Sequence, residues 1–155
     1  MGSEVETDPV SDLTFVKQPV EREGGTVVME HVYRCYAEKR AGFDVEAEKV
    51  WRELREQLGI ANLEGVRIIC RYDVDQVDQE VYEMAKTTVF SEPMVDDFYD
   101  ETMPPIQGPH ALLIVEALPG QFDQRADSCA QCIQLLAGCD RPLVKAATVY
   151  VLLGD

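Results

Sequence analysis

Apolar residues recur along the chain at two spacings, and each spacing predicts one kind of element. Residues 27–38, 66–72, 111–118 and 147–153 are rich in β-branched, aromatic and other apolar residues, as is typical of strands. Between them, apolar residues recur every three or four positions, as on one face of an α-helix. The pattern therefore predicts strands that alternate with helices.

Three helices are predicted, each with a recognisable start. The first begins after the N-cap residue Asp44 and ends at Gly59, the last begins after Asp123, and a shorter one begins after Asp78. The predicted inner face of the first is Ala47, Val50, Trp51, Leu54 and Leu58. The inner face of the shorter helix is Val81, Met84, Ala85, Thr88 and Val89. That of the last is Ala126, Cys129, Ala130, Ile133, Leu136 and Ala137, with Gly138 as its end.

The two longer helices indicate an internal repeat. Asp44 and Asp123 are 79 positions apart, and so are Gly59 and Gly138. The same offset carries the first predicted strand onto the third without a gap. Because a cap, an inner face and an end must recur wherever the same unit recurs, we predict two related strand-helix-strand units.

The repeat divides the chain into four parts. Residues 1–29 mix acids with Pro and Gly and are predicted to be a flexible acidic leader. Residues 30–93 form the first predicted unit. Residues 94–109, rich in proline, are a predicted connector, and residues 110–155 form a second, truncated unit.

The second unit lacks a counterpart of the helix that follows Asp78. An apolar sheet face without cover costs about 25 cal/mol per Å² of exposed apolar area. We therefore expect that the chain is part of a longer one, or that another chain supplies the missing layer. The predicted fold class is α+β, with a mostly antiparallel sheet and helices packed on one face.

Charge and composition exclude two classes of partner. A formal net charge of −15 at pH 7 opposes the phosphate backbone, so nucleic-acid binding is not expected. No apolar run approaches the roughly 20 residues that cross a bilayer, so no membrane partner is expected. Residues 1–9 are acidic instead of basic and then apolar, unlike a secretory signal, and a cytoplasmic location is expected.

Several segments resemble one enzyme family. The most specific is 118–128, which reads LPGQFDQRADS. The others are 42–47, 66–68, 71–74, 88–93, 95–97, 130–134 and 141–142. Together these residues resemble the amino-terminal region of the long, single-chain phosphoribosylformylglycinamidine synthases of bacteria. In that family the region is similar to two copies of the small S subunit of the multi-subunit enzyme.

The resemblance implies a role in purine biosynthesis. The parent enzyme is an ATP- and glutamine-dependent carbon-nitrogen ligase, and this region is its non-catalytic assembly domain. It would join the synthetase and glutaminase modules and help to form the ammonia passage. ATP and magnesium would bind elsewhere in the parent enzyme, so we expect no cofactor in this chain and no activity of the chain alone. The expected partners are those modules or another copy of the chain.

Two interpretations of the polar residues around the last helix remain open. As a candidate domain interface they comprise Gln121, Gln124, Arg125, Asp127, Ser128, Gln131 and Leu135. In that interpretation Arg125 would form two parallel hydrogen bonds to a carboxylate, and Leu135 would insert into a partner. Alternatively, Asp123 is a helix cap, and Gln124, Asp127 and Gln131 form the ordinary solvent-exposed side of the helix. A stand-alone ferredoxin-like domain that binds or senses a small molecule is the alternative function.

Reactive chemistry is weakly indicated. Cys129, Cys132 and Cys139 invite a zinc or redox interpretation, but no histidine completes four ligands. Cys129 with His110 resembles a nucleophile and base only in residue type. The neighbouring acids at 96 and 97 are a weak magnesium candidate. We predict no catalytic, cofactor-binding or metal-ligating residue.

Overall fold

A computed structural model describes residues 31–155, and the statements below concern that range. The predicted leader, 1–29, and the part of the first predicted strand before His31 lie outside the described residues. The elements are β1 (Tyr33–Lys39), α1 (Val45–Glu56), β2 (Leu63–Asp75), α2 (Gln79–Thr88), β3 (Asp96–Asp100), β4 (His110–Glu116), α3 (Gln124–Ala137) and β5 (Leu143–Gly154).

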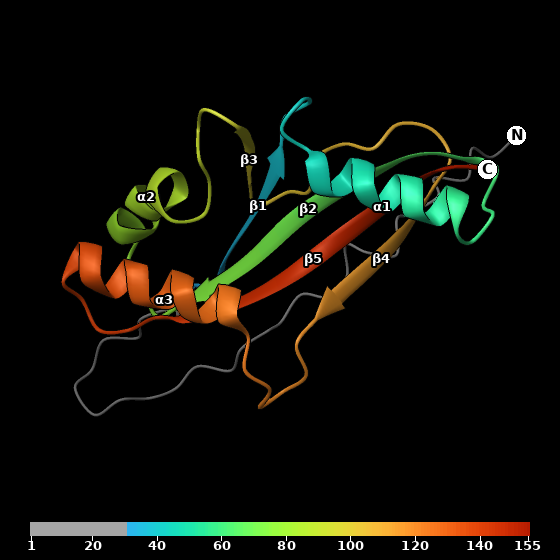
Figure 1. Cartoon of the computed structure of the whole chain (residues 1–155). Helices are drawn as coiled ribbons and strands as arrows, with labels where there is room; N and C mark the ends of the chain where they lie inside the picture. The colour runs from blue at the N-terminus through green and yellow to red at the C-terminus, as the bar shows by residue number, and fades with distance from the viewer. Residues whose placement is uncertain (1–30) are drawn as a thin grey trace, which may run out of the picture. The chain divides into compact units, whose positions relative to one another are not determined.

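The strands form one five-stranded sheet in the order β3-β1-β2-β5-β4, shown in Figure 1. Every neighbouring pair is antiparallel. The longest strands, β2 and β5, pair with each other at the centre, while β3 and β4 are the edges. The predicted α+β class with an antiparallel sheet is confirmed.

The helices cover one face of this sheet, as predicted. In Figure 1, α1 and α3 lie along the same side of the strands. The core on this side draws on three strands and on α2 and α3, and its buried members are Cys35, Tyr72, Val74, Tyr82, Ala85, Phe90, Ala126, Cys129, Ile133 and Ala146. Helix α1 is held against β2, because the indole nitrogen of Trp51 donates a 3.1 Å hydrogen bond to the carbonyl of Leu63.

The opposite face has a second core, covered by chain without helix. Its buried members are Tyr36, Ile69, Val149 and Val151. Met103 and Ile106, from the predicted connector, pack against it, and Pro104 is fully buried. The connector also begins with edge strand β3, which the sequence pattern did not predict because aspartates at 96, 97 and 100 are poor strand formers.

Capping aspartates position two of the helices as predicted. The side chains of Asp78 and Asp123 accept hydrogen bonds from backbone amides in the first turns of α2 and α3. Gly138 ends α3 in the left-handed conformation, with φ 61°. Asp44 precedes α1 but does not cap it, because its side chain accepts instead from the amide of Gly42 at 3.0 Å.

Three residues predicted to face inward are exposed. Leu58 is 69% exposed because α1 ends at Glu56, before its inner face reaches Leu58. Leu136 is 60% exposed in the last turn of α3, and Thr88 is exposed at the last position of α2. The buried ring of Tyr82, by contrast, was not among the predicted inner residues.

Two β-α-β units are present, but the gapless 79-residue offset between them is wrong for the strands. Cys35 belongs to the helix-covered core, whereas Ile114, 79 positions later, pairs with Val149 of the opposite core. With an offset of 78, equivalent strand residues lie on the same face of the sheet. Cys35 and Tyr72, which pair across β1 and β2, then correspond to Leu113 and Tyr150, which pair across β4 and β5. The helices stay at 79, so one residue is inserted between β4 and α3.

Candidate docking face on helix α3

One stripe of α3 faces solvent along the length of the helix. Gln124, Ser128, Gln131 and Leu135 are exposed, and they recur every three or four residues, which places them on one helix face. Leu135 is 74% exposed. The buried residues of α3, such as Ile133, lie on the opposite face. The structure therefore brings four of the seven predicted interface residues together.

The loop before α3 exposes two more large apolar side chains. Leu118 is 72% exposed and Phe122 is 73% exposed. The loop is held in shape by Gln121, whose side-chain oxygen accepts a 3.1 Å hydrogen bond from the amide of Leu118. Sequence reasoning missed Leu118 and Phe122, because apolar residues beside a strand and a helix are expected to pack inward. Gln121, a predicted interface residue, thus also shapes the turn, which the sequence did not indicate.

Asp127 has a partner within the chain. Its carboxylate forms a short ion pair with the guanidinium of Arg141, which also donates to the backbone carbonyl of Asp127. Both side chains are about half exposed. The pair fastens α3 to the segment that leads into β5, so Asp127 has a structural role that the sequence did not indicate.

Arg125 turns away from the stripe and lies over the sheet. Its Nη1 donates to Cys70 Sγ at 3.2 Å and to Thr148 Oγ1 at 3.3 Å, and these two residues are directly paired across β2 and β5. Burial lowers the pKa of Arg125, but the nearby Cys70 and Tyr72 raise it above its usual value. No ion pair joins this guanidinium to a carboxylate of residues 31–155, so it retains donors for an external anion.

A hollow of about 390 Å³ opens beside Arg125. Its floor includes Cys70 and Tyr72 of β2, and its walls include Ala47 of α1 and Phe90, which follows α2. Two further cations line it, and both are neutralised: Lys39 pairs with Asp96 at 2.9 Å, and Arg67 pairs with Glu38 at 2.7 Å. Among the cations that line this hollow, Arg125 is the one that no carboxylate of the described residues neutralises.

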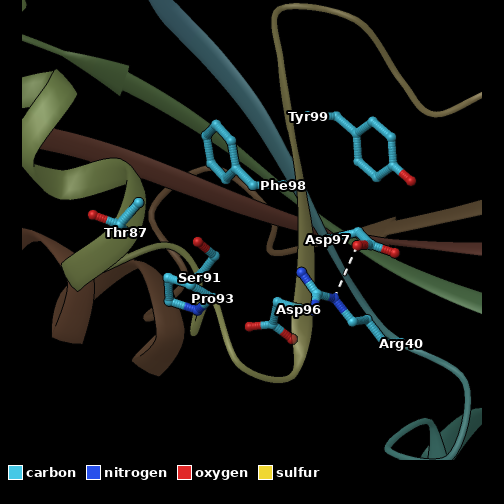
Figure 2. A pocket seen from close by; sticks show the side chains of 8 residues that line it. All are labelled: Arg40, Thr87, Ser91, Pro93, Asp96, Asp97, Phe98 and Tyr99. Atoms are coloured by element: carbon cyan, nitrogen blue, oxygen red, sulfur yellow. Dashed lines mark hydrogen bonds and ion pairs between the residues drawn. The ribbon is translucent and has the colours of Figure 1, made fainter.

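A second hollow, of about 440 Å³, lies beside edge strand β3 and is shown in Figure 2. Arg40 pairs there with Asp97 at 3.0 Å, while Asp96 pairs with Lys39. Asp96 and Asp97 are consecutive strand residues, so their side chains point to opposite faces of the sheet. Each carboxylate has its own cation, and the two do not converge as magnesium ligands.

The cysteines are free thiols in different surroundings. Cys129 is buried, and burial raises its pKa to about 11, so the thiol stays protonated at neutral pH. Burial likewise raises the pKa of Cys35 to about 12. Cys132 is exposed on α3. Within residues 31–155, no three His, Cys, Asp or Glu side chains gather in a metal-binding group.

Strand β4 carries the uncovered surface expected of the second unit. All its residues except Leu112 are exposed. On the helix-facing side, Leu113 is 55% exposed and Val115 is 50% exposed, because no helix of the described range lies over them. In the first unit, the equivalent Cys35 is fully buried in the core to which α2 contributes Tyr82.

Comparison with protein-family models, with curated proteins and with solved structures finds no match. In the part of the chain that the structure describes, no helix has the length and apolar character needed to span a membrane.

Proposed function

We propose that this chain is the non-catalytic assembly domain of a phosphoribosylformylglycinamidine synthase. The observation that carries the proposal is the exposure of Leu118, Phe122 and Leu135, each about three-quarters exposed. Leu118 and Phe122 belong to the segment with the most specific family resemblance, 118–128, and Leu135 lies on the helix that follows. These side chains are largely exposed in the part of the chain that the structure describes, which supports a role in binding another protein surface.

Burial of these residues would supply much of the binding energy. Covering a large apolar side chain contributes about 1.5–3 kcal/mol, and a few such anchors dominate most interfaces. The amides of Gln124 and Gln131 would form the polar rim beside them. Arg125 would add a charge-assisted hydrogen bond to a carboxylate that reaches the neighbouring hollow.

In the assembled enzyme this domain would join the synthetase and glutaminase modules in the cytoplasm and shape the ammonia passage between them. The reaction is the ATP-driven transfer of glutamine-derived ammonia to the formyl amide of a ribonucleotide. The modules outside this chain would bind ATP and magnesium and supply the reacting groups. The raised pKa values of Cys35 and Cys129 support the expectation that neither thiol is a glutaminase nucleophile.

Reconstitution tests the proposal. The purified chain is mixed with the remaining domains of such a synthase, and complex formation and glutamine-dependent turnover are measured. We expect the wild-type chain to form a complex and support turnover, and Phe122→Asp and Leu135→Asp each to weaken the complex at least about tenfold. Leu58→Asp is the matched control, because Leu58 is an equally apolar exposed residue of the first unit. Neither complex nor turnover with the wild-type chain would contradict the proposal.

The hollow beside Arg125 favours a second candidate, a stand-alone domain that binds a small anion. Its guanidinium forms no ion pair with a carboxylate of residues 31–155, which makes it a suitable anchor for a carboxylate or phosphate. Calorimetric titration with a panel of dicarboxylates and nucleotides tests this candidate. Binding that Arg125→Gln abolishes, with no affinity for the synthase domains, would favour it over the assembly role.

A further inference from the structure

The two edges of the sheet differ in how they are protected. Edge strand β3 carries aspartates at 96, 97 and 100, and such charges discourage pairing with another sheet. In edge strand β4, residues 111–115 are Ala-Leu-Leu-Ile-Val, without a charge or a proline. An exposed, apolar and unprotected edge of this kind is a template for the addition of a strand.

The hydrogen bonds to β5 show which groups of β4 face outward. The amide of Gly154 donates to the carbonyl of Pro109 at 3.1 Å, and the register pairs His110 with Leu153. In an antiparallel pair, alternate residues direct their amide and carbonyl toward the neighbouring strand. The backbone N–H and C=O groups of the odd-numbered residues of β4 therefore point toward β5. No strand of residues 31–155 pairs with the other side of β4, where the backbone groups of the even-numbered residues point: His110, Leu112, Ile114 and Glu116.

We propose that β4 pairs antiparallel with β4 of a second copy of this chain, about a two-fold axis at Leu113, so that two sheets become one. This register places Leu112 opposite Ile114 of the second copy and Leu113 opposite its own counterpart. His110 then lies opposite Glu116 of the second copy, and the symmetry repeats this pair at the other end. The proposal concerns a different surface from the α3 face and does not depend on the proposed function.

The phase of the hydrogen bonds and the charges select this register. Outward-facing residues must pair with outward-facing residues, so a slip of one residue is excluded. A slip of two residues leaves the ends unpaired and opposes His110 to an apolar residue. In the centred register, the protonated ring of His110 keeps its Nδ1 bond to the carbonyl of Gly108 and donates from Nε2 to Glu116 of the second copy, so opposite charges meet. The neutral ring has one N–H, which the carbonyl of Gly108 takes, so the bond to Glu116 requires the protonated ring.

The side chains at the two ends have groups free for this contact. Glu116 is 62% exposed and binds Arg71 through Oε2 at 3.0 Å, which leaves Oε1 without a hydrogen bond within residues 31–155. His110 contacts the carbonyl of Gly108 through Nδ1 at 2.9 Å, which leaves Nε2 without a hydrogen bond within residues 31–155. On the helix-facing side, Leu113 would be covered by its own counterpart and Val115 by Ala111 of the second copy.

The association would be weak. A single pair of seven-residue strands buries less than the roughly 1,200 Å² at which standard stable interfaces begin. The net charge of −15 on each copy adds long-range repulsion. We therefore expect a dimer whose population rises with protein concentration through the micromolar range.

Sedimentation equilibrium of the full chain, from about 1 to 500 μM, tests the proposal. We expect a monomer-dimer equilibrium that Leu113→Lys weakens at least about tenfold, because two ammonium groups would meet at the axis. Leu143→Lys is the matched control, since Leu143 is a leucine of 56% exposure on β5. Circular dichroism of each variant verifies that the fold is retained.

Charge exchange tests the register itself. His110→Glu, which opposes two carboxylates at each end, should weaken the dimer about three- to tenfold, and Glu116→Lys should weaken it by a similar factor. The double variant should recover affinity, because the pair is restored with reversed sign. A wild-type chain that stays monomeric to the highest concentration, a dimer insensitive to Leu113→Lys, or the absence of recovery would each overturn the proposal.

Discussion

The hydroxyl of Tyr82 donates a 2.7 Å hydrogen bond to Oδ1 of Asp100, which ties α2 to edge strand β3. The ring of Tyr82 is almost fully buried and stacks on Tyr33 of β1, with 4.2 Å between the ring centroids. Lys86, one turn further along α2, binds the other oxygen of Asp100 at 2.5 Å. One carboxylate thus joins a helix to the edge of the sheet.

Removal of the Tyr82 hydroxyl should destabilise the fold. We expect Tyr82→Phe to lower the free energy of unfolding by about 1–2 kcal/mol, because the ring packing is kept while a hydrogen bond to a charged group is lost. Urea denaturation measures the change. Tyr99→Phe is the control, since the Tyr99 hydroxyl has no hydrogen bond within residues 31–155, and an equal loss in both variants would contradict the assignment.

The contribution of Asp100 should depend on pH in a defined direction. Burial raises the pKa of Asp100, but the hydrogen bonds from Lys86 and Tyr82 outweigh it and leave the pKa below the usual value of 3.8. A lowered carboxyl pKa stabilises the fold above the unfolded-state value, and this stabilisation is lost as the pH falls through the folded-state value. We expect Asp100→Asn to be less stable than the wild type at pH 7, with a difference that shrinks below about pH 4. A difference that is constant with pH would contradict this assignment.

Gly154 should tolerate no side chain. Its φ is +135°, and a Cβ atom there would lie 2.2 Å from the backbone oxygen of Asn62. We expect Gly154→Ala to cost about 1–3 kcal/mol, limited by fraying at the end of β5. Thermal unfolding measures this cost. Gly65→Ala, where the nearest atom is 3.5 Å away on a leucine side chain, should change stability far less.

The two predicted cap residues of the long helices should differ in importance. Asp123 caps α3, so Asp123→Ala should lower the free energy of unfolding by about 1 kcal/mol. Asp44 does not cap α1, and Asp44→Ala should cost less. Chemical denaturation of the two variants side by side measures the contrast. A larger loss for Asp44→Ala would show that its bond to Gly42 matters more than the α3 cap.

The candidate docking face was only partly predictable from the chain. The sequence analysis included Gln124, Ser128, Gln131 and Leu135 among seven interface residues, and helical spacing alone places these four on one face. It did not show that Arg125 reaches Thr148, since that contact joins residues 23 positions apart through the packing of α3 on the sheet. The ion pair of Asp127 with Arg141 was not predictable for the same reason, since Arg141 approaches Asp127 only in the folded chain.

Local chemistry by itself determined the helices and their order with the main strands. Caps at Asp78 and Asp123, the glycine at 138 and the spacing of apolar residues act within a few residues of sequence, so they can be inferred without the fold. Tertiary structure alone decided that the acidic segment β3 is a strand, because it becomes one by pairing with β1. It also decided the 78-residue offset between the strands of the two units, which depends on the sheet face to which each side chain points. The fold likewise decided that β4 lies at an edge of the sheet formed by residues 31–155. Strand pairing joins residues far apart in the chain, so no local sequence pattern specifies which strands lie at the edges of the sheet.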